Sequence, residues 1–239
     1  MNAGRGVRTF AFATAGLLIV ATLFQLVDQL NLIYQPPAIP EGANLVDRVL
    51  ALIPYRQQDW PIFLGANLFA GLGFLAVVGL ALALAGQVGR SDDRRNLLLW
   101  TLASAGLVGL VGQLVLLGAV NASIAIPYCD CGFKNEEIVS QVWAEMVVQS
   151  AVQWLIWGAS LLAAGGLVIS GRLFAGRTMS LAWGWWSYLT AALLVVTVVL
   201  AYASVGGDLS TWLTLAATGI AVPAWAIWLG LRFSAVPIE

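Results

Sequence analysis

The side chains that could do chemistry in this sequence are amide and carboxyl groups set within long apolar stretches. Gln25, Asp28 and Gln29 are three and four residues apart, so a helix would carry them on one face. A polar stripe at four-residue steps follows later in the chain: Gln141, Glu145, Gln149 and Gln153. Asn67 and Gln113 add one amide each in two other stretches. The pattern predicts that four helices present polar groups at comparable depth.

Asp28 and Glu145 are the informative members of this set, because an ionised group within a bilayer is costly unless it is paired or hydrated. No Arg, Lys or His lies inside the apolar stretches away from their ends. Each acid would therefore be protonated, bound to a cation or reached by water. We predict a binding site for a cation or polar ligand from these residues: Asp28, Glu145, Gln25, Gln29, Asn67, Gln113, Gln141 and Gln149.

A structural role is the alternative for the same residues. Glutamine and asparagine often bridge membrane helices through hydrogen bonds. Glu145 could lie near the headgroups if the first turns of its helix project above the lipid, and Asp28 is close to the end of its own helix. Arg48, Arg56 or Lys134 could also fold down from the loops and pair with the acids.

Several missing residue types exclude most catalytic chemistry. The chain has no histidine, and Lys134 is its single lysine. Haem, zinc and copper sites and histidine-activated nucleophiles depend on imidazole or on several thiolates. No GxxxxGK[ST] run is present, so there is no P-loop. We therefore predict no catalytic residue, no metal site and no cofactor, which argues against an enzyme.

The two cysteines, Cys129 and Cys131, stand together in one loop and form a possible disulfide. A thiol pair outside the cytoplasm tends to be oxidised. A disulfide across one intervening residue would close a small, strained ring, and such bonds are reducible. A local staple or two free thiols are the favoured interpretations, and a redox or metal-capture role is the alternative.

The elements that must position these groups are membrane-spanning helices. Of the 239 residues, 60% are apolar and 10% are charged, whereas a soluble domain has about a quarter charged residues. Lipid must therefore be the outer solvent, and the net charge of −1 gives no case for nucleic acid. We predict an all-α integral membrane protein, a six-transmembrane-helix bundle, with residues 1–239 as a single domain. The predicted helices span about 9–31, 61–86, 97–121, 138–169, 181–205 and 211–232.

The orientation follows from the count of basic residues in the loops. One side carries Arg5, Arg8, Arg90, Arg94, Arg95, Arg172, Arg177 and Arg232, while the other carries Arg48, Arg56 and Lys134. The excess predicts an N-in/C-in protein of the plasma (inner) membrane with both termini cytoplasmic. Abundant Ala, Gly, Val and Leu with scarce Lys suggest a bacterial source.

Two outer loops, 32–60 and 122–137, connect the predicted helices. In the first, Leu45, Val46, Val49, Leu50 and Ile53 share one face at helical spacing, which predicts a short amphipathic helix on the membrane surface. Pro61 is expected to set the start of the second helix, and Pro223 to kink the sixth. Trp183 is expected at a membrane interface, whereas Trp154, Trp157 and Trp225 should pack between helices.

Three functions are compatible with these features. The first is a non-catalytic accessory or structural subunit of a larger membrane protein complex, with other membrane subunits or a second copy as partners besides lipid. The alternative is a small channel or transporter that binds a cation or polar solute at an outward-facing site around Asp28 and Glu145. An intramembrane lipid-modifying enzyme that uses carboxylate acid–base chemistry is the second alternative.

Overall fold

The computed structural model of the chain describes residues 3–35, 37–38, 42, 45–89, 92–125, 135–203 and 208–233. Regular structure in these ranges is helical, because a helix satisfies every backbone polar group within its own segment. The elements are α1 (Ala3–Gln29), α2 (Leu45–Ala85), α3 (Asp93–Ala125), α4 (Asn135–Phe174), α5 (Leu181–Tyr202), α6 (Asp208–Ala216), the π-helical turn η2 (Ala217–Ala221) and α7 (Val222–Arg232).

Six stretches of these helices are long and apolar enough to cross a bilayer. They are Gly4–Gln29, Pro54–Ala85, Asp93–Asn121, Met146–Phe174, Leu181–Tyr202 and Leu209–Arg232. The prediction of an all-helical, multi-pass protein with six membrane-spanning helices is therefore confirmed. The choice of membrane and the cytoplasmic position of the termini stay predictions.

Contacts between neighbouring helices close the six spans into a ring. Each of α1 to α4 packs on the next helix in the chain, α5 packs on α6 and α7, and α7 returns to α1. The start of α1 and the end of α7 lie together, where Arg8 Nη2 donates a hydrogen bond to the Phe233 carbonyl oxygen at 3.2 Å. We call this the terminal end of the bundle, and the opposite end, where α1 and α5 finish and α6 begins, the far end.

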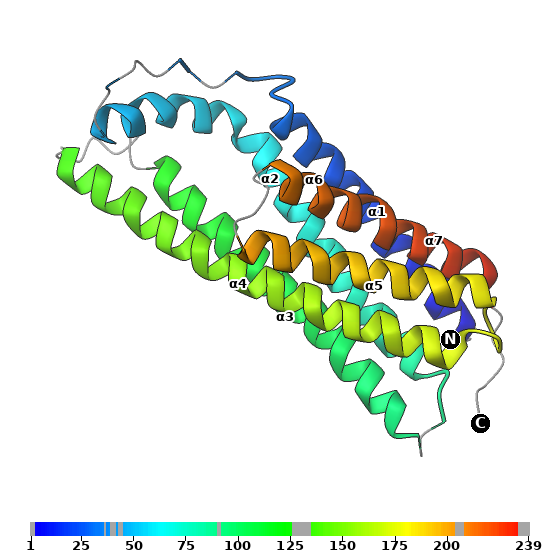
Figure 1. Cartoon of the computed structure of the whole chain (residues 1–239). Coiled ribbons are helices and arrows are strands. Elements are labelled where there is room, and N and C mark those ends of the chain that lie inside the picture. The colour runs from blue at the N-terminus through cyan, green and yellow to red at the C-terminus, as the bar shows by residue number, and fades with distance from the viewer. Residues whose placement is uncertain are drawn as a thin grey trace.

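The second span is longer than predicted. Residues 45–53, expected to form a separate amphipathic helix, belong to α2, and Pro54 and Pro61 lie inside that helix instead of starting one. A proline within a helix removes one backbone hydrogen bond and bends the chain. Figure 1 shows the first part of α2 running at an angle to the rest. That this part lies on the outer membrane surface stays a prediction.

Helix six is disturbed ahead of Pro223, as predicted. The turn before the proline, η2, is π-helical and separates α6 from α7. A wider turn accommodates the proline ring, which would otherwise collide with the carbonyl group four residues earlier. That earlier residue is Gly219, where a Cβ atom would lie 2.3 Å from Thr22 Cγ2 of α1. The π-helical turn therefore packs directly on the Thr22 side chain of α1.

Tryptophan packing differs from the expectation at two positions. Trp183 is completely buried and stacks on Trp225, with ring centroids 5.5 Å apart, so it lies in the core and not at an interface. Trp225 packs between helices as predicted, and its Nε1 donates to Ser187 Oγ at 2.8 Å. Trp154 is 58% exposed, and its ring packs edge-on against Tyr202 of α5, with ring centroids 5.7 Å apart, so it contacts a neighbouring helix on one side only. An aromatic ring in an apolar sequence fits the lipid surface as well as the core, so its type did not decide its place.

Candidate functional site

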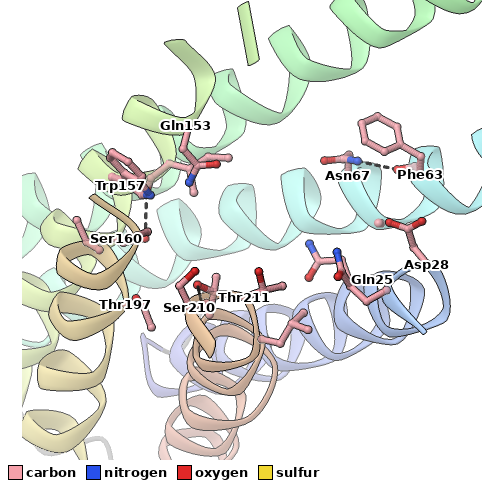
Figure 2. Close-up of a pocket in the computed structure, with 17 residues that line it drawn as sticks. Gln25, Asp28, Phe63, Asn67, Gln153, Trp157, Ser160, Thr197, Ser210 and Thr211 are labelled. Carbon is pink, nitrogen blue, oxygen red and sulfur yellow. Dashed lines mark hydrogen bonds between the residues drawn. The ribbon is translucent and has the colours of Figure 1, made fainter. Parts of the chain in front are cut away.

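A cavity of about 410 Å³ lies within the far half of the bundle. Five helices line it: α1, α2, α4, α5 and α6. Its polar lining residues are Gln25, Asp28, Gln29, Asn67, Gln153, Ser160, Thr197, Ser210, Thr211 and Thr214. Figure 2 shows Asp28, Gln25 and Asn67 at one side of this space and Gln153, Trp157 and Ser160 at the other. The cavity thus concentrates polar groups inside an otherwise apolar protein.

The first side of the cavity is built by α1 and α2. Gln25, Asp28 and Gln29 all line it, as their shared helical face predicted. Asn67 is 7% exposed, and its Nδ2 donates to the Phe63 carbonyl oxygen at 2.7 Å (Figure 2). That bond fixes the amide, so its Oδ1 atom remains available to a ligand.

The opposite side is lined by hydroxyl groups that share one geometry. Ser160 Oγ donates to the Ile156 carbonyl at 2.9 Å, and Thr197 Oγ1 donates to the Leu194 carbonyl at 2.8 Å. Thr214 Oγ1 donates to the Ser210 carbonyl at 2.8 Å. Because each hydroxyl hydrogen is used within its own helix, the oxygen atoms remain as hydrogen-bond acceptors.

A second carboxyl group lies beside the cavity. Asp59 of α2 is 9% exposed and lies beside Asp28 of α1. Nearby, Tyr55 Oη donates to Asn31 Oδ1 at 3.4 Å. The far end of α1 is thereby linked to α2 through polar contacts.

Asp59 opens onto a smaller neighbouring cavity of about 190 Å³. Its lining residues are Tyr55, Arg56, Asp59, Trp60, Phe63, Val120 and Gln149. Phe63 lines both cavities, so it stands between the two spaces. Sequence reasoning missed Asp59 because residues 32–60 were assigned to a loop. Its four-residue spacing from Tyr55 and Phe63 was the signal that could have placed it on the same helical face.

The other predicted site residues have different positions. Gln149 lines the smaller cavity together with Asp59, and not the larger one. Gln113 of α3 is 6% exposed and does not line the larger cavity, and its Oε1 has no hydrogen-bond partner in the part of the chain that the structure describes. Gln141 and Glu145 belong to α4, but their side chains lie outside the described residues, as does the loop with Cys129 and Cys131. The ligand role of the whole set stays a prediction.

The ring of helices is loosest around α6. Among the described elements, α6 packs closely on α5 and η2, while α1 packs on η2 and α7. α1 and α6 therefore separate toward the far end, and the cavity lies between them.

The described residues contain no group of three His, Cys, Asp or Glu side chains that could hold a metal ion. Comparisons with protein-family models, with curated proteins and with solved structures found no match to this chain. The function must therefore be argued from the cavity and its lining residues.

Proposed function

We propose that this multi-pass membrane protein is a small transporter that binds a polar solute in the far-end cavity. The observation that carries the proposal is the cavity itself, about 410 Å³ in volume and lined by polar groups from five helices. Sites for small molecules typically have volumes of ~300–1,000 Å³ and a few convergent polar groups. With both termini cytoplasmic, as the arginine distribution predicts, the cavity would face the outside of the cell.

The unused hydrogen-bonding capacity of the lining amides supports binding over a structural role. Gln25, Gln29 and Gln153 line the cavity without a hydrogen bond to another helix, within the described ranges. Amides that only hold helices together would bond across the helix interface. In a membrane interior, amides that face a cavity need water or a solute as their partner.

The interrupted sixth span supports transport over simple binding. α6 carries the lining residues Thr211 and Thr214, and the π-helical turn η2 and Pro223 follow it directly. Discontinuous helices line the binding sites of many transporters, and π-helical turns are frequent at functional sites. Because α6 packs closely on few neighbours, the turn is suited to act as a hinge for its movement.

The other two predicted functions gain less support. A lipid-modifying enzyme would need a nucleophile or base next to Asp28, but Ser160 and Thr214 direct their hydrogens to their own helices. An accessory subunit would need a partner surface, and the exposed apolar side chains are those that lipid would cover anyway. The accessory role stays a prediction.

The transport proposal is tested with a variant that fills the cavity and a control variant that carries the same substitution elsewhere on α4. Ser160→Trp places an indole in the cavity, while Ser150→Trp places one on an exposed face of α4. We expect Ser160→Trp to abolish solute-dependent thermal stabilisation in detergent and uptake into proteoliposomes across a metabolite panel. Ser150→Trp should preserve both. Equal uptake by the two variants would contradict a transport role for this cavity.

A further inference from the structure

The lining of the larger cavity is acidic, and within the described residues its acidic group is a single carboxyl group. Asp28 is the single ionisable residue that lines the larger cavity, among the residues that the structure describes. Asp59 lies beside Asp28 and adds a second carboxyl group next to the cavity, at the smaller neighbouring space. No described Arg or Lys lines the cavity. A carboxyl group without a basic partner in its surroundings is stabilised best by a positively charged ligand.

The hydrogen-bonding groups around this charge are rich in acceptors. Asn67 and the hydroxyls of Ser160, Thr197 and Thr214 already donate to backbone carbonyls, and their oxygens remain free to accept. A ligand that pairs with these oxygen atoms must supply hydrogen-bond donors or positive charge. The amide N–H groups of Gln25, Gln29 and Gln153 can donate to the polar, uncharged part of such a ligand. Anions and ligands composed mainly of acceptors would leave these oxygen atoms unpaired, which disfavours them.

Two aromatic rings and the size of the space favour an organic cation over a bare metal ion. Phe63 lies on the Asp28 side of the cavity and Trp157 on the opposite side (Figure 2). Aromatic faces attract ammonium groups through cation–π interactions. A bare ion would instead need about six oxygen atoms at ~2.0–2.6 Å, closely gathered around one point. A cavity of about 410 Å³ with one lining carboxyl group does not provide this arrangement.

We propose that the cavity selects a small organic cation with a single positive charge, an amine or quaternary ammonium compound whose remainder is polar and uncharged. This inference rests on the proposed transport function and names its substrate class. The ammonium group lies between Asp28 and Phe63, and the remainder reaches the amide and hydroxyl groups of Gln153 and Ser160. Zwitterions are rejected because their carboxylate would have no basic partner in the lining and would be repelled by Asp28.

The first experiment measures binding of three probes to the purified full-length protein by isothermal titration calorimetry. Choline carries one positive charge and a hydroxyl group. Glycine betaine has the same trimethylammonium group but a carboxylate in place of choline's hydroxymethyl group, and 3,3-dimethyl-1-butanol has carbon in place of the choline nitrogen. We expect choline to bind at least roughly 30-fold more tightly than the other two, the lower range for loss of one buried charge partner. Sodium chloride at matched ionic strength should not compete with choline.

A pair of variants assigns the effect to Asp28. Asp28→Asn should weaken choline binding by a similar factor of roughly 30. Asp93→Asn removes the same charge at the exposed start of α3, outside the cavity, and should leave binding unchanged. If Asp28→Asn does not fold, the choline–dimethylbutanol comparison on the unmodified protein still tests the role of charge.

The outcomes separate this inference from the proposed function. Equal affinity for choline and dimethylbutanol, equal affinity for betaine, or choline binding that survives in Asp28→Asn would overturn the organic-cation inference. If sugars or other neutral polar solutes bind instead, and Ser160→Trp blocks them, transport stands and the substrate class is wrong. If no solute responds to Ser160→Trp, both proposals fail.

Discussion

Gly219 is the point where the π-helical turn η2 touches α1, and a single methyl group there should separate the two segments. A Cβ atom at this position would lie 2.3 Å from Thr22 Cγ2, 2.6 Å from Oγ1 and 2.8 Å from Cβ. Thr22 cannot rotate away easily, because its branched side chain is stiff and its Oγ1 donates to the Leu18 carbonyl at 2.8 Å. Relief must therefore come from movement of a helix backbone.

The expected cost of Gly219→Ala follows from this overlap. Inserting a methylene into a packed interior costs ~1–3 kcal/mol, while replacing glycine by alanine in a helix gains ~0.5–1 kcal/mol. We expect a net loss of about 1–2 kcal/mol in unfolding free energy. Gly158→Ala is the matched control, because a Cβ atom there meets no atom within 4 Å. That variant should be neutral or slightly more stable.

The assay is unfolding in mixed detergent micelles, followed by tryptophan fluorescence. Thr22→Gly combined with Gly219→Ala removes all three Thr22 atoms that the new Cβ atom would meet, so the penalty from the overlap should largely disappear. The reasoning is refuted if Gly219→Ala is as stable as Gly158→Ala, or if the double variant shows no coupling between the two sites. Because η2 joins α6 to α7, Gly219→Ala should also lower solute affinity at the cavity.

Two further predictions concern the same half of the ring. Trp225→Phe removes the 2.8 Å hydrogen bond to Ser187 Oγ and part of a buried ring, so it should cost about 2–3 kcal/mol in the same unfolding assay. Trp185→Phe, at a position 73% exposed, should stay within ~0.5 kcal/mol, and similar losses for the two would contradict the buried role of Trp225. Pro223→Ala should let η2 revert toward an α-helical turn, raising the melting temperature and slowing proteoliposome uptake with little change in solute affinity. Unchanged uptake would argue against a hinge at this turn.

The number and order of the helices could be predicted because lipid imposes one requirement on every span. About 20 apolar residues are needed to cross the bilayer, and runs of that length are visible without any knowledge of packing. Helix boundaries were less predictable. Pro54 and Pro61 are typical signals for a helix start, yet both lie inside α2. In a membrane protein, neighbouring segments can satisfy the backbone groups that a proline frees, so the signal loses its usual meaning.

The candidate site was predictable where it depended on one helix. Gln25, Asp28 and Gln29 share a face of α1 by their spacing alone, and the structure places all three at one cavity. The sequence does not reveal which side chains of different helices lie next to one another. Gln113 has similar chemistry but is buried outside the larger cavity, and Asp59 has a neighbour in Asp28 that only the packing of α1 on α2 creates.

The polar stripe of α4 illustrates how one helix can serve two spaces. Gln149 and Gln153 are one turn apart, yet Gln149 lines the smaller cavity and Gln153 the larger one. Opposite them, α2 places Asp59 at the smaller cavity and Asn67 at the larger, with Phe63 lining both.

The two helices thus carry matching polar groups along adjoining spaces, and the aromatic ring of Phe63 stands between them. A solute that passed from the smaller space to the larger one would leave Gln149 and Asp59 and meet Gln153 and Asn67. On the way it would pass the Phe63 ring, whose face attracts cations. Under the proposed transport function, Phe63 is therefore the side chain that a cation would pass between the two spaces.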